Sequence, residues 1–121
     1  EDERHIVWEM AGVLNGRTYP AGKLVRFGYV ELSHEKEQKE SCYLKQGEVI
    51  KGHEFHYWDS TQNGTDCLAV KPDKKRSWNC IHMRDNLFAG FPHLYFRSNP
   101  NFVERFIDAC KEWDITVNQT N

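Results

Sequence analysis

Short strand patterns fill the middle of the chain, and a single helix pattern follows them. The segment 24–32 is rich in β-branched and aromatic residues and comes after a turn-prone segment at 15–22. Further strands are expected near residues 42–45, 48–51, 53–58, 66–71, 78–84 and 87–96. This arrangement predicts a strand-rich fold that is closed by one helix.

The helix is expected to begin at residues 98–100. Ser98 or Asn99 can cap it, and Pro100 suits the first turn. Apolar residues then recur three and four positions apart and form one face, which predicts a packing helix that ends near Asp114 with a frayed tail. That face consists of Phe102, Phe106, Ala109, Cys110 and Trp113.

Length and composition narrow the class of protein. A chain of 121 residues with 39% hydrophobic and 13% aromatic residues is typical of one globular domain. The formal charge of −2 provides no field that would attract nucleic acid or a lipid surface, and no apolar run approaches the ~20 residues of a membrane span. Neither nucleic acid nor a membrane is therefore expected as a partner.

The four cysteines are Cys42, Cys67, Cys80 and Cys110, and none of them forms a C-x-x-C pair. The spacing argues against a zinc ribbon or a thioredoxin-type site. We interpret them as small buried thiols.

Residues 52–57 read Gly-His-Glu-Phe-His-Tyr and concentrate titratable groups in one expected strand. Alternation along a strand places His53 and Tyr57 on one side, and Glu54 and His56 on the other. The alternation separates the two imidazoles but leaves Glu54 able to orient His56. The segment is either a ligand or catalytic edge, or an exposed strand whose polar groups are satisfied by water and loops.

A second candidate is His93, a lone histidine in the apolar run 91–96. Such a histidine is often a hydrogen-bonded core residue, but active-site side chains gather where strands end. Because His93 comes just before the helix cap, it is a functional candidate. His5, His34 and His82 have no comparable context and are interpreted as surface or packing residues.

Three segments occur in an order and spacing that resemble one family. They are Phe-Gly-Tyr-Val-Glu-Leu at 27–32, the hexapeptide at 52–57, and His-Leu-Tyr-Phe with Ser-Asn-Pro at 93–100. The chain is similar in these segments to the C-terminal glutamine amidotransferase domain of cobyrinic acid a,c-diamide synthases. Residues 11–16 also resemble that family's Val-Gly-Val-Leu-Pro-Gly segment, with Asn15 in place of proline.

The resemblance implies an α/β fold class. We expect residues 1–121 to form a single partial domain, the C-terminal part of a flavodoxin-like class I glutamine amidotransferase domain, strand-rich with one C-terminal packing helix. It also implies a cytoplasmic ligase of cobalamin biosynthesis. In that family a cysteine hydrolyses glutamine, and the ammonia amidates acetate side chains of a cobyrinate-type tetrapyrrole that are activated by ATP and magnesium.

The resemblance assigns roles residue by residue. His93 matches the catalytic general base. The residues His53, Glu54, His56 and Tyr57 are expected to bind substrate or support the site. Related amidotransferases carry a glutamate two residues after this histidine where the chain has Tyr95, so the group that orients His93 is unassigned, with Glu54 as a candidate by elimination.

Two parts of the family's machinery lack a match. No cysteine stands in a glycine-flanked turn of the kind that exposes a nucleophile, and Gly22-Lys23-Leu24 lacks the spacing of a phosphate-binding loop. We therefore expect the nucleophile and the ATP-binding domain to lie in a missing N-terminal part. The chain alone is expected to bind no cofactor and to be inactive.

Two other classes stay open. The chain could be a non-catalytic, β-rich module that binds a ligand through Phe55, Tyr57 and Trp58. It could instead be a metal-binding protein that uses His53, Glu54 and His56.

Overall fold

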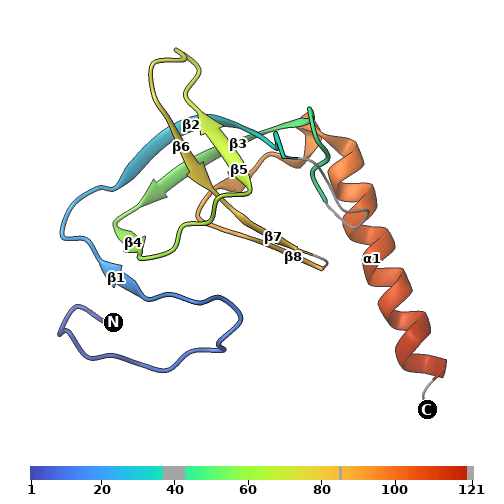
Figure 1. The fold of residues 1–121 in the computed structure, drawn as a ribbon, viewed down its shortest axis with the longest axis horizontal. Helices are drawn as coiled ribbons and strands as arrows, with labels where there is room; N and C mark the ends of the chain where they lie inside the picture. Colours follow the sequence, from blue (N-terminus) through green and yellow to red (C-terminus); the bar gives the residue numbers. More distant parts are fainter. Residues whose placement is uncertain (37–42, 85, 120–121) are drawn as a thin grey trace.

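The computed structural model describes residues 1–36, 43–84 and 86–119, and Figure 1 shows their arrangement. The strands are β1 (Thr18–Pro20), β2 (Arg26–Ser33), β3 (Val49–His56), β4 (Trp58–Ser60), β5 (Cys67–Val70), β6 (Ser77–Cys80), β7 (His82–Arg84), β8 (Leu87–Ala89) and β9 (His93–Leu94). A short 3-10 helix, η1 (Phe96–Ser98), leads into the helix α1 (Pro100–Gln119).

The central feature is a five-stranded sheet in the order β6-β5-β2-β3-β9, in which each neighbouring pair is antiparallel. Strands β2 and β3 form its longest ladder, from Arg26 opposite His56 to Ser33 opposite Val49. Two smaller antiparallel ribbons, β1 with β4 and β7 with β8, lie outside this sheet (Figure 1).

The core lies against one face of the sheet. Alternate residues of β2 and β3 point inward, which buries Val30, Leu32 and Ile50 to 2% exposure or less. The segment after β6, the residues before β3 and the first turn of α1 pack onto the same face. The buried apolar residues are Val30, Leu32, Tyr43, Leu44, Ile50, Cys67, Ala69, Cys80, Ile81 and Phe102.

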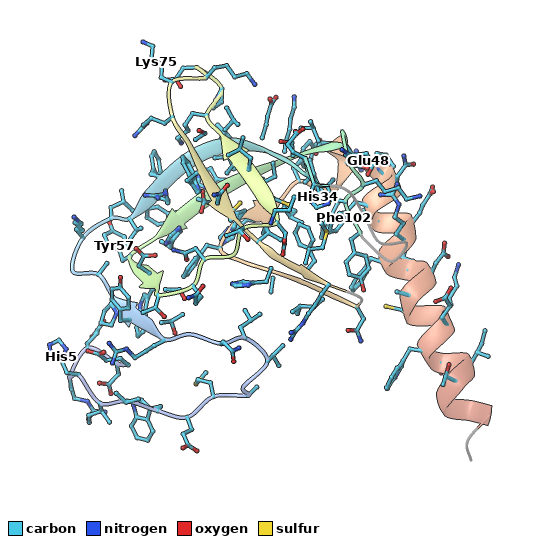
Figure 2. All side chains as sticks on the ribbon, viewed as in Figure 1. His5, His34, Glu48, Tyr57, Lys75 and Phe102 are labelled. Carbon is cyan, nitrogen blue, oxygen red and sulfur yellow. The ribbon has the colours of Figure 1, made fainter. Side chains whose placement is uncertain are left out.

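Helix α1 is fixed to the sheet by its first two turns. The Asn99 side chain caps it, because its Oδ1 accepts the amide of Phe102 at 3.2 Å and its Nδ2 donates to the Val49 carbonyl at 3.2 Å. One turn later, the two terminal guanidinium nitrogens of Arg105, Nη1 and Nη2, each donate to the Glu48 carboxylate at 2.7 Å. In Figure 2, Glu48 and Phe102 accordingly appear near the start of the helix.

The structure confirms the α/β class, with a multi-stranded sheet and one C-terminal helix, and it confirms the cap at Asn99. It corrects several boundaries. The segments 48–51 and 53–58 belong mainly to one strand, β3; residues 43–45 form no strand; and β1 lies inside the segment expected to be a turn. Residue 42, the start of one predicted strand, lies outside the described residues.

The helix prediction was wrong in two respects. Helix α1 continues to Gln119 and extends away from the sheet (Figure 1). Of its predicted apolar face only Phe102 is buried, with Ala109 partly covered, while Phe106 and Trp113 are 53% and 67% exposed. The 3.6-residue periodicity identifies an apolar face, but a face can be buried only where a neighbouring element reaches it.

Within the described part of the chain, no helix combines the length and apolar character needed to cross a membrane.

Candidate functional site

Strand β9 places His93 directly beside the hexapeptide. His93 is the cross-strand partner of His53, and Leu94 is the partner of Gly52. Gly52 permits this approach, because a Cβ there would lie 2.9 Å from the His93 carbonyl oxygen. Since directly opposite residues in an antiparallel pair share a face, the two imidazoles lie together on the outer face, away from the core.

The turn after His93 is tied to the same strand. The Tyr95 amide donates to the Lys51 carbonyl at 2.8 Å, and the Lys51 amide donates to the Ser98 hydroxyl at 2.8 Å. The Ser98 hydroxyl in turn donates to the Tyr95 carbonyl at 2.6 Å. These bonds join β9, η1 and the helix start to β3, so the position of His93 is defined by main-chain contacts and by the Ser98 hydroxyl.

The outer face around His53 is aromatic and exposed. The His53 ring contacts Tyr29 and Phe27, with centroids 5.3 and 5.7 Å apart, and Phe55 contacts Phe27 and Tyr57, each with centroids 5.8 Å apart. Phe27 and Tyr29 are 62% and 73% exposed, and Phe55 and Tyr57 are each 52% exposed. We call these five residues of the outer face the aromatic face.

Lys71 supports the part of the aromatic face that lies on β2. Strand β5 pairs with β2 from Glu31 to Ser33, so among the described residues the carbonyls of Phe27 and Tyr29 have no strand partner on that side. The buried ammonium of Lys71 donates to both carbonyls instead. Gly28 leaves room for the ammonium, since a Cβ there would lie 2.9 Å from Lys71 Nζ.

Glu54 and His56 lie on the inner face of β3 and form a hydrogen bond. His56 Nδ1 must donate to the Trp58 carbonyl at 2.7 Å, because a carbonyl only accepts. His56 Nε2 also lies 3.2 Å from Glu54 Oε1. The hydrogen bond between them therefore needs one hydrogen between that nitrogen and the carboxyl group.

This pair borders a small cavity of about 30 Å³, the space of roughly one water molecule. Phe91 stacks on the His56 ring with centroids 4.2 Å apart, and Pro92, the residue before His93, also lines the cavity. Glu54 Oε2 and the indole nitrogen of Trp78 are buried without a hydrogen-bond partner among the described residues. Glu54 and His56, which we call the inner pair, thus lie next to Phe91 and Pro92 on the inner face of the sheet, whereas His93 lies on the outer face.

The described cysteines do not supply an activated nucleophile on the aromatic face. Burial and the nearby charge of Glu54 raise the pKa of the Cys80 thiol to about 12, so this thiol stays protonated at neutral pH. Cys67 is its cross-strand partner and is also buried. The prediction of buried thiols is confirmed for both and wrong for Cys110, which is exposed; Cys42 lies outside the described residues.

The structure groups the predicted site residues into two sets. It brings His93 and His53 together, with Tyr57 farther along the same face, and it brings Glu54 to His56 on the opposite face. Glu54, the candidate for orienting His93, bonds to His56 instead. Sequence reasoning missed Phe27 and Tyr29, although their alternation in β2 mirrors that of His53 and Phe55 in β3.

Two further predictions concern the role of His34 and a metal site at His53, Glu54 and His56. His34 is buried and its Nδ1 donates to the Asp66 carbonyl at 2.6 Å, which confirms a packing role. Strand alternation separates His53 from Glu54 and His56, and residues 1–36, 43–84 and 86–119 contain no cluster of three or more His, Cys, Asp or Glu side chains suited to a metal ion.

Comparison with known proteins supports the resemblance found in the sequence. The chain is 32% identical over 108 residues to the cobyrinate a,c-diamide synthase of Caldanaerobacter subterraneus subsp. tengcongensis, a match that covers 88% of the chain. It is 32% identical over 111 residues to that of Picrophilus torridus and 27% identical over 115 residues to that of Salmonella typhimurium. The chain resembles part of a cobyrinate a,c-diamide synthase.

The chain spans only 23%, 21% and 24% of the lengths of these three synthases. No protein-family profile matches it, and no solved structure matches it significantly. The sheet and helix described above therefore correspond to one segment of such a synthase and not to a whole synthase.

Proposed function

We propose that this chain is the glutaminase-domain portion of an ATP-dependent, cytosolic cobyrinate a,c-diamide synthase. In this proposal it is the C-terminal part of a flavodoxin-like glutamine amidotransferase domain and helps release ammonia from glutamine. The ammonia would amidate acetate side chains of a cobyrinate-type tetrapyrrole elsewhere in the protein. Similarity to synthases over 85–92% of the chain supports the assignment.

The observation that carries the proposal is the position of His93. Its ring belongs to an exposed residue at the end of a strand, while the surrounding main chain is fixed by β3 and η1. A general base needs a defined position and an accessible nitrogen, and none of the described contacts of the chain engages the His93 ring nitrogens. His53 beside it and Tyr57 farther along the face are suited to line the glutamine-binding side.

The chemistry assigned to His93 is proton transfer. It would take the proton from a cysteine thiol as the thiolate attacks the glutamine amide, and deliver that proton to the departing ammonia. It would then activate the water that hydrolyses the thioester. In this proposal the thiol comes from another part of the synthase, since Cys80 is held protonated and Cys67 is buried in the core.

The inner pair would have a supporting role. The His56 ring stacks on Phe91, and Glu54 and His56 line a small cavity together with Phe91 and Pro92, two residues that lead directly into β9. In this proposal the hydrogen bond from Glu54 positions the His56 ring, and the stacked His56 ring supports Phe91 in the segment before His93, without contact with the reacting atoms. ATP and magnesium are proposed to bind outside this chain, because residues 22–24 lack the glycine spacing of a phosphate loop.

The test uses a chimera in which this chain replaces the matched segment of the Caldanaerobacter synthase. We expect His93→Ala to reduce glutamine-dependent amidation by about 10²-fold or more while ammonia-dependent amidation is retained. His5→Ala is the matched control, because His5 is an exposed histidine remote from β9 in sequence. Equal loss of both activities in His93→Ala would contradict the role in glutamine hydrolysis.

A further inference from the structure

The chain exposes far more surface than a compact protein of its mass. Its accessible area is 8932 Å², whereas a folded monomer of 14.3 kDa is expected to expose about 6,800 Å². The difference of about 2,100 Å² exceeds the ~800 Å² that one partner contributes to a standard protein interface. The exposed residues 3–17 before β1 and residues 110–116 of α1 account for some of it, and the outer face of the sheet for another part.

Of these exposed surfaces, the aromatic face is the one on the β2–β3 ladder of the central sheet. Its side chains contact one another edge to face, and their main chains belong to the longest ladder of the sheet. Large exposed patches of aromatic residues on a monomer mark interaction sites. Interface centres are enriched in Tyr, Trp and Phe and depleted in charge, with a polar rim.

The residues around the aromatic face fit this description. Farther along the same outer face, Glu31 pairs with Lys74 at 2.7 Å, and Lys51 follows on β3. The charged groups therefore lie toward one end of the sheet, and the aromatic side chains toward the other. The fitting partner is a polypeptide surface with an uncharged, apolar centre and polar borders.

We propose that Phe27, Tyr29 and Phe55 of the aromatic face form the seam against which the remaining polypeptide of the synthase packs, beside the glutamine-binding side assigned to His53 and Tyr57. This inference rests on the proposed function. The matched synthases have roughly four times the length of this chain, so they hold ample polypeptide to cover the face. The face is continuous with His93 through the His53–His93 pair, so the same contact that covers Phe27 and Phe55 brings the remainder of the synthase to the histidine.

A second copy of the chain is a poorer occupant. Two identical aromatic faces in contact would place His93 in a symmetric interface, where it could not meet a nucleophile from another part of the synthase. The proposal therefore requires the isolated chain to stay monomeric at micromolar concentration.

The experiment compares the isolated chain with the chimera described above. Hydroxyl-radical labelling of Phe27, Tyr29 and Phe55 should be strong in the isolated chain and fall by about fivefold or more in the chimera, as their side chains enter an interface core. The double variant Phe27→Lys/Phe55→Lys should shift the melting temperature of the isolated chain by less than about 2 °C, because both side chains are already exposed. In the chimera it should lower the melting temperature by about 10 °C or abolish soluble protein.

Val49→Lys is the matched control. Val49 lies on the outer face of the same strand, at the end away from the aromatic residues, and is 43% exposed. It should have the same small effect in both contexts. Unchanged labelling in the chimera, equal tolerance of the double variant in both contexts, or a dimer of the isolated chain that the double variant dissociates would each overturn the proposal.

The two proposals can fail separately. If the aromatic residues are protected in the chimera but its His93→Ala variant keeps glutamine-dependent activity, the seam is supported and the catalytic role of His93 is rejected. A glutamine-specific loss in His93→Ala, with Phe27 and Phe55 still fully labelled, would do the reverse.

Discussion

Replacing Gly52 with alanine should test how β9 holds His93. A Cβ at this position would lie 2.9 Å from the His93 carbonyl oxygen and 3.3 Å from Leu32 Cδ1. The first neighbour is backbone and cannot rotate away, so β9 must move by several tenths of an ångström. The substitution therefore perturbs the candidate site through packing and not through any change of charge.

The sign of the change in the free energy of unfolding on Gly52→Ala distinguishes close packing against β9 from the ordinary effect of replacing glycine by alanine. Where the geometry has room, glycine to alanine stabilises a protein by ~0.4–1 kcal/mol, through the reduced entropy of the unfolded chain. Overpacking costs ~1–3 kcal/mol. We expect a net loss of about 1–2 kcal/mol, or roughly 4–8 °C in melting temperature for a chain of this size.

Thermal unfolding and hydrogen exchange provide the measurements. The Tyr95 amide, which donates to the Lys51 carbonyl at 2.8 Å, should lose protection in Gly52→Ala, because this bond closes the β3–β9 pair. Lys51→Ala, one residue earlier on the exposed side, serves as the control and should leave Tyr95 protected. A stabilised Gly52→Ala variant with full protection at Tyr95 would refute the close packing of β9 on β3.

Three further predictions concern the supports of the site. The hydrogen bonds from the Arg105 guanidinium lower the pKa of Glu48 from 4.5 to about 2. The contribution of the ionised Glu48 to the free energy of unfolding is therefore present above pH ~4.5 and is lost as the pH falls toward 2. Glu48→Gln should destabilise the chain by about 1–2 kcal/mol at pH 7 and by much less at pH 2.5, as measured by urea unfolding at both pH values. Glu54→Ala should cost about 2–3 kcal/mol because it leaves Nε2 of the partly buried His56 without its partner, whereas Glu54→Gln, which can donate to a neutral imidazole, should cost less than about half of that in the same assay; equal costs would contradict the hydrogen bond between Glu54 and His56. Phe102→Ala should cost about 3–5 kcal/mol, and Trp113→Ala, on the exposed part of α1, less than about 0.5 kcal/mol; comparable losses would mean that the outer helix packs after all.

The sequence predicted local features better than their three-dimensional grouping. Alternation in residues 53–57 correctly separated His53 and Tyr57 from Glu54 and His56, because the side chains of a strand point to opposite faces whatever the strand pairs with. The cap at Asn99 was equally predictable, since a side-chain cap depends on a few adjacent residues.

The pairing of His93 with His53 was not predictable from local patterns. It depends on the order of strands in the sheet, which joins residues 40 positions apart, and on Gly52, whose role appears only when a backbone lies against it. Glu54 was expected to be available for His93, but the register turns it inward to His56. The helix face around Phe106 and Trp113 failed as a core prediction because Tyr43 contacts Phe106 without burying it, and both helix side chains stay more than half exposed.

The central claim is that the exposed imidazole of His93 faces a thiol carried by the rest of a synthase. The most direct measurement is a crystal structure of the chimera with this chain in place, and in it the distance from the His93 ring to the nearest cysteine sulfur. We expect a sulfur from outside residues 1–121 within hydrogen-bond reach, ~3–4 Å in an enzyme without substrate. A His93 ring directed into bulk solvent, with no cysteine sulfur within about 8 Å, would contradict the proposed function.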